Sequence, residues 1–585
     1  GAAENLPAYA SRDVLTDLTS APTSLTAGGN LLIDGNANIT DSMLGVSGDT
    51  ERTDLINWIR GQDVDDADGD GTISEDRLAI GDPLHSRPVA INYGLDENEQ
   101  AQVVLFFGTN AGNLHAIDAT NGVELFTYIP QELLGLQADL RLNSGSSSHF
   151  YGLDGSPSAW VRNTGSNQIL SAEDDHVYLY IGQRRGGQNY YALDVTDTAN
   201  PRLMWKIQPS DAGFSALGYS WARPVVGRLN VGGVARDVIY LSGGYDEAND
   251  DETTRNDNAD EMGNALYIVD AVDGSLIWSA GLGDGNTVTM PDMLHAIPAA
   301  PAVFDVDSDG FDDGFFVGDT GGQVWRFDFF QGQAAENLAT GGVIAQLGAG
   351  GTVDASANRR FYHTPDVALA DVAGVTKLVV TIGSGARPNP LSETVYDRFY
   401  AIFQDEVFAA PAAYTVLTEG DDPATTDIIE ASNFYDATDN LLQSSDGGTV
   451  QAELDKLAGK NGWYMGFPRI GEKVLSTPLS FRGGVSFTTY EPRNESDSCT
   501  PKAGTSRLYL VSLTDGTVPE EQNRVTPPVV DGPPDRFTEL NTPSIVDEPV
   551  IICTDQGCEL FAGPEQPPIP LLEGDNIVRT HWRQD

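Results

Sequence analysis

The sequence predicts an all-β protein: a seven-bladed β-propeller with an N-terminal lead-in and acidic loop insertions. The main observation is a short motif in which proline precedes an apolar run, and which occurs seven times. Its prolines are Pro88, Pro157, Pro224, Pro301, Pro365, Pro478 and Pro543. They lie 64 to 77 residues apart, except for one interval of 113 residues after Pro365. Such internal repetition is typical of propellers, whose radial closure protects the sheet edges.

The second observation is that each motif is followed by strand patterns in the same order, which predicts a four-stranded meander per repeat. Proline is tolerated at the first position of a strand because its missing N–H need not enter the ladder. The expected second strands are apolar and end near glycine: Val103–Gly108, Val177–Gly182, Val238–Gly243, Phe315–Gly318 and Leu378–Gly383. Third strands follow, such as Leu114–Asp118 and Tyr190–Asp194, and then outer strands with Trp or Phe, such as Leu125–Tyr128, Leu203–Trp205 and Leu276–Trp278.

These patterns divide the chain into a lead-in, residues 1–80, and a propeller, residues 81–585. In the lead-in, Thr53–Arg60 is expected to form a short amphipathic helix that Gly61 ends. Two acidic insertions, about 246–261 and 404–460, are expected to form loops on one face. A solvated role is favoured for them over a binding role, because most surface loops only connect strands.

Composition limits the partners. The chain of 585 residues has 86 acidic and 33 basic residues and a formal net charge of −53, so nucleic acid and anionic lipid would be repelled. No apolar run reaches eighteen residues, so no transmembrane helix is expected. Three cysteines exclude a disulfide-built scaffold; Cys553 and Cys558 could close a hairpin loop and leave Cys499, but the sequence does not settle the pairing.

The segment Asp305–Asp313 has the pattern of a calcium loop. Asp305, Asp307 and Asp309 alternate, Gly310 permits the chain reversal, and Asp313 occupies the ninth position. Calcium takes six to eight oxygen ligands at about 2.3–2.6 Å. We therefore predict Ca²⁺ as the cofactor, bound by these four carboxylates and the carbonyl of Phe311; the alternative is an acidic turn without an ion.

A second acidic loop has a less complete pattern. Asp66, Asp68 and Asp70 occupy the first, third and fifth positions, Thr72 offers a carbonyl, and Ser74 stands ninth. The twelfth position is Arg77, where a helix-loop-helix calcium site needs an acidic ligand. A second Ca²⁺ and a plain acidic loop both remain open for these residues.

The segments Ala116–Gly122 and Ile268–Trp278 resemble the tryptophan-docking repeat of quinoprotein dehydrogenases, so the propeller is expected to be of the modified, quinoprotein-like kind. In those enzymes the repeat ties blades together and does not bind the quinone. Many of them also contain adjacent cysteines, which this chain lacks. The seven histidines form no His-x-His or His-x-x-x-His pair that would indicate catalytic zinc.

Taken together, Trp58–Gly61, Gly81–Pro88, Gly108–Ala116 and the Asp305 loop leading into Gly318–Asp328 resemble the C-terminal propeller of the PilY/PilC family of type IV pilus tip adhesins. The resemblance covers most of residues 50–560. It implies an exported protein at the cell surface, pilus tip or outer membrane, and it places the family's calcium ligands on Asp305, Asp307, Asp309, Phe311 and Asp313.

The resemblance implies a non-enzymatic protein that supports pilus extension against retraction, twitching motility and adhesion. Its expected partners are minor pilins at the pilus tip and a host-cell or abiotic surface. Two alternatives remain: a periplasmic quinoprotein oxidoreductase, and an integrin-α-like calcium propeller. The second alternative should repeat the calcium loop in several blades, whereas the repeats here contain one complete copy.

Overall fold

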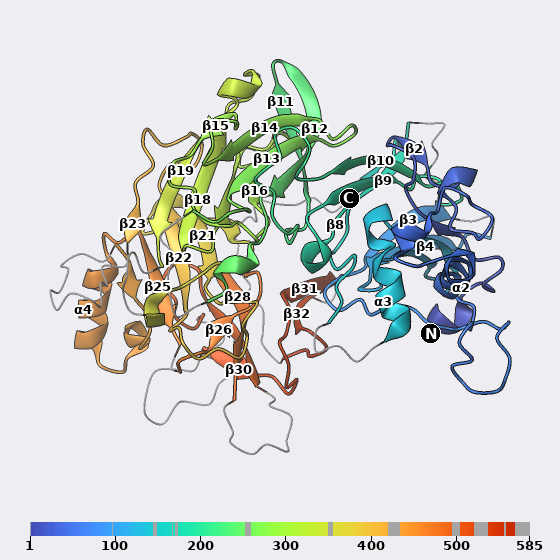
Figure 1. Cartoon of the computed structure of the whole chain (residues 1–585). Coiled ribbons are helices and arrows are strands. Elements are labelled where there is room, and N and C mark those ends of the chain that lie inside the picture. The colour runs from blue at the N-terminus through green and yellow to red at the C-terminus, as the bar shows by residue number, and fades with distance from the viewer. Residues whose placement is uncertain are drawn as a thin grey trace.

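The computed structural model describes residues 2–95, 98–143, 149–165, 168–169, 174–251, 259–348, 355–418, 433–467, 469–493, 504–519, 536–554 and 557–567. Within these ranges the protein is an all-β, propeller-like assembly of sheets (Figure 1). No described helix is long and apolar enough to cross a membrane.

The first three sheets each contain an antiparallel meander of four consecutive strands. The first meander is β3 (Val89–Leu95), β4 (Ala101–Gly108), β5 (Leu114–Asp118) and β6 (Glu124–Tyr128). The second is β7 (Ser158–Arg162), β8 (His176–Gly182), β9 (Tyr190–Asp194) and β10 (Arg202–Ile207). The third is β11 (Val225–Val231), β12 (Val234–Ser242), β13 (Ala265–Asp270) and β14 (Leu276–Gly281).

Sheets four to six repeat this order. The fourth contains β16 (Ala302–Phe304), β17 (Gly314–Gly318), β18 (Gln323–Phe329) and β19 (Ala339–Gln346). The fifth contains β20 (Asp366–Val372), β21 (Val375–Gly383), β22 (Arg398–Gln404) and β25 (Gly462–Gly466). The sixth contains β26 (Lys473–Val474), β27 (Leu479–Phe481), β28 (Gly484–Glu491), β29 (Thr505–Ser512) and β30 (Phe537–Glu539).

The repeated proline marks the start of the first strand in six of these sheets, as predicted. In each, the residue after the proline is the first of the strand: Val89, Ser158, Val225, Ala302, Asp366 and Leu479. The seventh proline does not behave in this way. No strand begins directly after Pro543; the last sheet is instead the hairpin β31 (Pro549–Thr554) and β32 (Gly557–Ala562). Within the described residues this unit therefore has two strands of the four-stranded meander expected there.

Short two-residue strands, most of them from distant segments, complete the outer edges of the first five sheets. From the lead-in, β1 (Val14–Leu15) pairs with β6 and β2 (Thr23–Ser24) pairs with β10. In the third sheet β15 (Val288–Thr289) pairs with β14. The 404–460 insertion supplies β23 (Leu417–Thr418) beside β19 and β24 (Tyr435–Asp436) beside β25. This insertion is thus not only a loop, because parts of it extend two sheets.

The helices are few. In the lead-in, α1 spans Asp41–Leu44 and α2 spans Asp49–Arg60, where Gly61 ends it with a φ of 105° as the sequence predicted. The helix α3 (Leu136–Leu142) follows the first sheet. The helix α4 (Gly447–Leu457) lies in the 404–460 insertion, and the Asp446 side chain caps it by accepting hydrogen bonds from two backbone N–H groups.

Tryptophans link neighbouring sheets. The indole N–H of Trp205 on β10 donates to the Ala271 carbonyl after β13 at 3.1 Å, and a Cβ on Gly274 would lie 2.7 Å from that ring. Trp463 on β25 donates in the same way to the Leu513 carbonyl after β29 at 3.0 Å. Both indoles lie in buried clusters that span adjacent sheets, so they fasten one sheet to the next.

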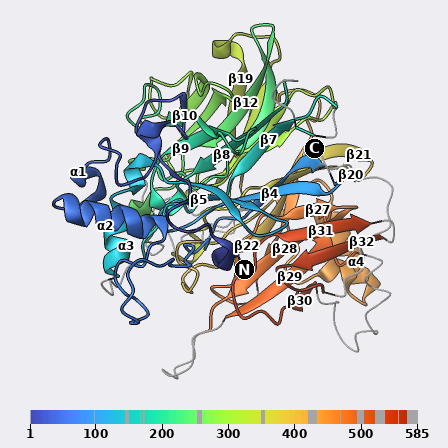
Figure 2. The ribbon, with the colours of Figure 1, turned by 90° about the vertical axis from the view of Figure 1, so that its right-hand side faces the viewer.

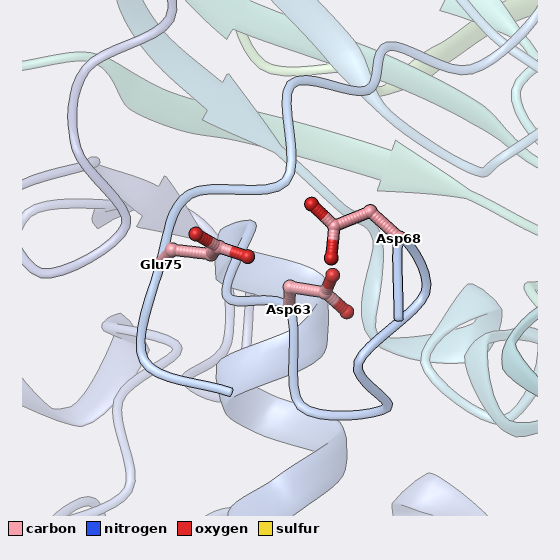
Figure 3. Close-up of side chains that lie close together, drawn as sticks. All are labelled: Asp63, Asp68 and Glu75. Carbon is pink, nitrogen blue, oxygen red and sulfur yellow. The ribbon is translucent and has the colours of Figure 1, made fainter. Parts of the chain in front are cut away.

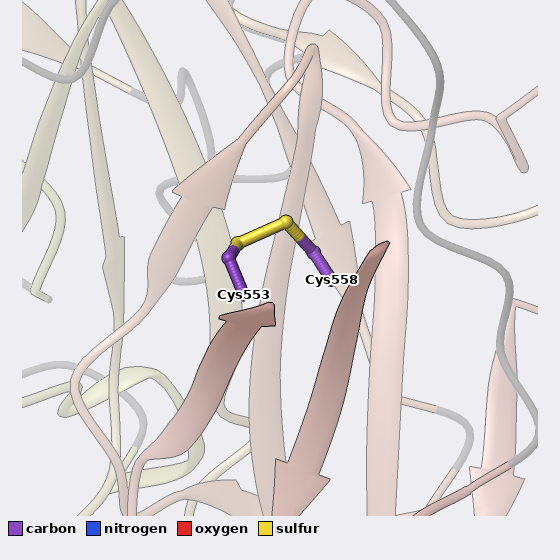
Figure 4. The surroundings of a disulfide bond; sticks show 2 residues. All are labelled: Cys553 and Cys558. Atoms are coloured by element: carbon purple, nitrogen blue, oxygen red, sulfur yellow. A yellow bond between two sulfur atoms is a disulfide. The ribbon is translucent and has the colours of Figure 1, made fainter. Parts of the chain in front are cut away.

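The hairpin β31–β32 lies between the orange strands of the sixth sheet and the blue strands of the first (Figures 1 and 2). Leu560 and Val546 pack against Leu508 of the sixth sheet. On the other side, Arg87 before β3 pairs with Glu548 at 2.6 Å. A disulfide joins Cys553 to Cys558 within the hairpin (Figure 4), and Cys499 lies outside the described residues.

Candidate metal centre

The Asp305–Asp313 loop connects β16 to β17 in the fourth sheet. One carboxylate oxygen from each of Asp305, Asp307 and Asp313 can be chosen so that all three lie within 4.8 Å of one another. Asp309 does not belong to this trio; its carboxylate accepts a hydrogen bond from the Phe311 backbone N–H at 2.8 Å. The structure therefore brings together three of the four carboxylates that the sequence singled out.

Backbone hydrogen bonds fold the loop around these side chains. The Asp305 carboxylate accepts from the N–H groups of Ser308 at 2.7 Å and Gly310 at 3.0 Å, and that of Asp307 accepts from Asp309 N–H at 3.1 Å. Gly310 has a φ of 86°, the left-handed conformation that glycine adopts without strain. Phe311 supplies a carbonyl that accepts no hydrogen bond among the described residues, so its oxygen is available to a cation.

Asp313 closes the loop against its own sheet. Its carboxylate accepts from the Val306 backbone N–H at 2.7 Å, and its backbone N–H donates to the Phe304 carbonyl at 2.8 Å. Burial raises the pKa of Asp313 to about 6, and the nearby carboxylates of Asp307 and Asp305 add to the increase. Crowded carboxylates with a raised pKa are what a bound divalent cation would relieve.

The residue beside it, Asp312, ties the loop to the third sheet. Its buried carboxylate accepts hydrogen bonds from the Arg228 backbone N–H at 2.6 Å and from the Tyr240 hydroxyl at 2.9 Å, and its N–H donates to the Arg228 carbonyl. A Cβ on Gly227 would lie 2.2 Å from this carboxylate, so only glycine fits there. The sequence reasoning missed this role, because Asp312 stands at the eighth position, which supplies no calcium ligand.

The second acidic loop follows α2 and has the same internal hydrogen bonds. Asp66 accepts from the Gly71 N–H at 2.9 Å, Asp68 from the Asp70 N–H at 3.2 Å, and Asp70 from the Thr72 N–H at 2.7 Å. These are the contacts that Asp305, Asp307 and Asp309 make at the same loop positions. The carboxylates of Asp66, Asp68 and Asp70 also lie within 4.8 Å of one another.

Two further carboxylates lie close to this second loop, although they were not among its predicted ligands. Asp63, Asp68 and Glu75 form another trio within 4.8 Å, and their carboxylates point toward a common space (Figure 3). Partial desolvation raises the pKa of Glu75, and the surrounding Asp70 and Asp68 raise it further. Counting ligand positions from Asp66 could not identify Asp63, which precedes the loop, or Glu75, which takes the tenth position.

Both loops fit a hard cation such as Ca²⁺, because each gathers oxygen donors and no nitrogen or sulfur donors. The first loop is held more firmly. It lies between two strands of one sheet and is hydrogen-bonded to the next sheet, and two of its trio, Asp305 and Asp313, are half-buried. The second loop follows a helix, and two of its trio, Asp68 and Asp70, are exposed.

Comparisons with known proteins agree with this architecture. Residues 89–389 match the family model described as the PilY1 beta-propeller domain. The chain is 28% identical over 451 residues to the type IV pilus biogenesis factor PilY1 of Pseudomonas aeruginosa, covering 70% of this chain and 35% of that protein. It is 26% identical over 443 residues to a PilY1 homolog of Xylella fastidiosa, covering 72% of this chain and 26% of that protein.

The chain thus spans about a third of the length of the curated relatives it matches, or less. Among solved structures, the C-terminal domain of Pseudomonas aeruginosa PilY1 superposes with a TM-score of 0.52 at 20% sequence identity. That match covers 80% of this chain and 93% of the solved chain, and it shows a shared fold. Since the family model covers more than half of the chain, the chain belongs to the PilY1 β-propeller family.

Proposed function

We propose that this chain is the calcium-binding propeller of an exported type IV pilus biogenesis protein, and that it acts by binding and without catalysis. Membership of the PilY1 family supports the pilus role, because the matched relatives are named type IV pilus biogenesis factors. In this proposal the protein lies at the pilus tip or outer surface, contacts minor pilins, and supports pilus extension, twitching motility and adhesion.

The observation that carries the calcium part is the trio of Asp305, Asp307 and Asp313 within 4.8 Å. Three carboxylates at this separation repel one another, and Ca²⁺ with the free Phe311 carbonyl would neutralise them. Asp309 completes the proposed ligand set. For the second loop we propose a weaker Ca²⁺ site on Asp66, Asp68, Asp70, the Thr72 carbonyl and Ser74, with Asp63 and Glu75 as additional donors.

The effect of calcium would reach beyond the loop through Asp312. With Asp313 held by a cation, the adjacent Asp312 keeps its hydrogen bonds to Arg228 and Tyr240 of the third sheet. Without the cation, repulsion within the loop would loosen the junction between the third and fourth sheets. Calcium would in this way select the shape of the propeller that supports the pilus.

We also propose that the seven sheets close into a modified, quinoprotein-like ring. The support is the docking of Trp205 and Trp463 on neighbouring sheets and the ion pair between Arg87 and Glu548, which connects the first sheet to the last.

The test is genetic complementation in the bacterium that encodes this chain. We expect deletion to reduce surface pili and twitching, the parent gene to restore both, and D305A/D313A to restore neither in calcium-containing medium although the protein is exported normally. The matched control is D371N, which changes an exposed aspartate in the corresponding turn region of the fifth sheet. Full restoration by D305A/D313A would contradict the calcium part, and normal pili after deletion would contradict the pilus role.

A further inference from the structure

A second group of functional side chains lies at the opposite end of the sheets from the calcium loop. In each meander, the segment before the first strand and the segment after the antiparallel second strand lie at the same end. In four of the sheets these segments bring together arginines, which we call the hub cluster. Its members are Arg87, Arg184, Arg185, Arg223, Arg360 and Arg387.

Ring contacts place this cluster where the sheets converge. The ring centroids of Trp221 and Tyr362 are 6.0 Å apart, and those of Tyr245 and Tyr362 are 6.3 Å apart. Trp221 and Tyr245 belong to the third sheet, whereas Tyr362 precedes the first strand of the fifth. The fourth sheet lies between the third and the fifth, so side chains next to these two sheets can contact each other only near the centre of the assembly.

Two arginines of the cluster have no carboxylate within ion-pair distance, although buried cations normally require such partners. Arg184 pairs with Asp154 at 3.1 Å and Arg87 pairs with Glu548 at 2.6 Å. By contrast, within the described part of the chain neither Arg387 nor Arg185 forms an ion pair, although Asp547 and Asp154 attract Arg387 from a greater distance. Both are partly buried, in a protein whose net charge is −53.

Two hydrogen-bond donors without an acceptor lie at the hub cluster. The indole N–H of Trp221, a side chain 8% exposed, and the Nε–H of Arg185 are buried and have no acceptor among the described residues. The guanidinium carbons of Arg184 and Arg185 lie 4.4 Å and 5.3 Å from the Trp221 ring, so this ring holds two cations close together. Burial lowers the pKa of Arg184 to about 10, and the positive charge of nearby Arg387 lowers it further. The attraction of Asp154 raises the pKa but does not offset these two effects.

We propose that the hub cluster is a binding site for a carboxylate, held by the guanidinium groups of Arg185 and Arg387 and by the Trp221 N–H. Arginine presents planar paired N–H donors that match a carboxylate, and such charge-assisted hydrogen bonds are about twice as strong as neutral ones. The carboxylates that already lie among these arginines, Asp154, Asp250, Asp547 and Glu548, are fewer than the six arginines, so a small anionic group suits the site better than a polyanion. The ligand could be a free dicarboxylate or an acidic side chain of a partner protein.

The experiment is isothermal titration calorimetry on the full 585-residue chain in about 50 mM salt, where charge interactions are weakly screened. One probe is succinate and the other is an acetylated, amidated Gly-Glu-Gly peptide. We expect at least one probe to bind, and R387Q and R185Q each to weaken it at least tenfold. R387K, which keeps the charge without the paired donors, should weaken it less. The control is R236Q, at the distal end of β12, where Arg236 is half-exposed and pairs with Asp270.

Binding of succinate identifies a site for free dicarboxylates, and binding of the peptide alone identifies a site for a partner's acidic side chain. Either result supports the proposal if the loss follows R387Q and R185Q and not R236Q. The proposal is overturned if neither probe binds at millimolar concentration, or if R387Q binds as the parent does. Calcium titration of R387Q should match the parent, which separates this site from the calcium loop.

Discussion

The hydroxyl of Tyr240 donates a hydrogen bond to the buried carboxylate of Asp312 at 2.9 Å, although the two residues belong to neighbouring sheets. Asp312 directly precedes Asp313, the residue that closes the calcium loop. The loop is therefore attached to the third sheet at one residue and to its own sheet at the next. If the loop binds Ca²⁺ as proposed, this arrangement would connect the bound ion to the junction between the two sheets.

Tyr240→Phe should destabilise the protein by about 1–3 kcal/mol, because it leaves a buried carboxylate without one donor. Urea unfolding followed by tryptophan fluorescence measures the change. Tyr396→Phe is the matched control, since the Tyr396 side chain is 50% exposed and its hydroxyl has no partner among the described residues. Equal unfolding midpoints for the two variants would show that the hydrogen bond does not hold the sheets together.

Asp313→Asn should weaken calcium binding at least tenfold, equivalent to about 1.4 kcal/mol, because the variant removes one of three clustered charges. The measurement is calorimetric titration of the parent and the variant with CaCl₂. Asp371→Asn, at an exposed aspartate of the fifth sheet, should bind as the parent does. An unchanged dissociation constant in Asp313→Asn would show that the ligand assignment is wrong.

Asp68→Asn should abolish the second calcium site and leave the first, because Asp68 belongs to both carboxylate trios of that loop. Glu75→Gln should weaken that site less, since Asp66, Asp68 and Asp70 remain. Competition with a calcium-sensitive dye gives the stoichiometry, which we expect to fall from two to one in Asp68→Asn. A parent that binds a single calcium ion would instead show that this loop is a plain acidic turn.

Glu124→Gln should reduce stability at neutral pH by about 3 kcal/mol, because it leaves the buried guanidinium of Arg12 without its charge partner. Arg12 donates to the Glu124 carboxylate at 2.5 Å and 3.0 Å, and His115 hydrogen-bonds to it at 2.7 Å. Burial alone would raise the pKa of Glu124, but these hydrogen bonds outweigh it and lower the pKa to about 2.

A lowered pKa means that Glu124 contributes stability above its ordinary pKa of 4.5, and that this contribution is lost as the pH falls toward 2. Melting temperatures between pH 2.5 and pH 7 should therefore fall less steeply in Glu124→Gln than in the parent. Glu336→Gln, at an exposed carboxylate with no ion pair among the described residues, should follow the parent curve. Parallel curves for parent and Glu124→Gln would contradict the lowered pKa.

Much of the fold could be predicted from the sequence, because repeated local patterns encode it. Proline before the first strand and glycine at the end of the second both reflect backbone constraints, so β3 and β4 begin and end close to where the sequence places them. The outer strands β1 and β23 could not be predicted. Each has two residues, which is too short for any periodicity, and each pairs with a strand far away in the sequence.

The candidate site could likewise be predicted only in part from the sequence. The alternating aspartates around Gly310 predicted a loop that gathers carboxylates, because spacing within nine residues determines which side chains can meet. The spacing did not show that Asp307 joins the trio and Asp309 does not, since both accept a hydrogen bond from the loop backbone. The hub cluster could not be predicted either, since closure of the sheets brings together arginines as distant as Arg87 and Arg387.

Hydrogen–deuterium exchange with and without CaCl₂ is the most direct test of the proposal that calcium fixes the junction between the third and fourth sheets. We expect calcium to slow exchange in the loop and also in β11 and β12, which contact it through Arg228 and Tyr240, and to have no such effect in Asp313→Asn. Slower exchange confined to residues 305–313, or none at all, would contradict the proposal.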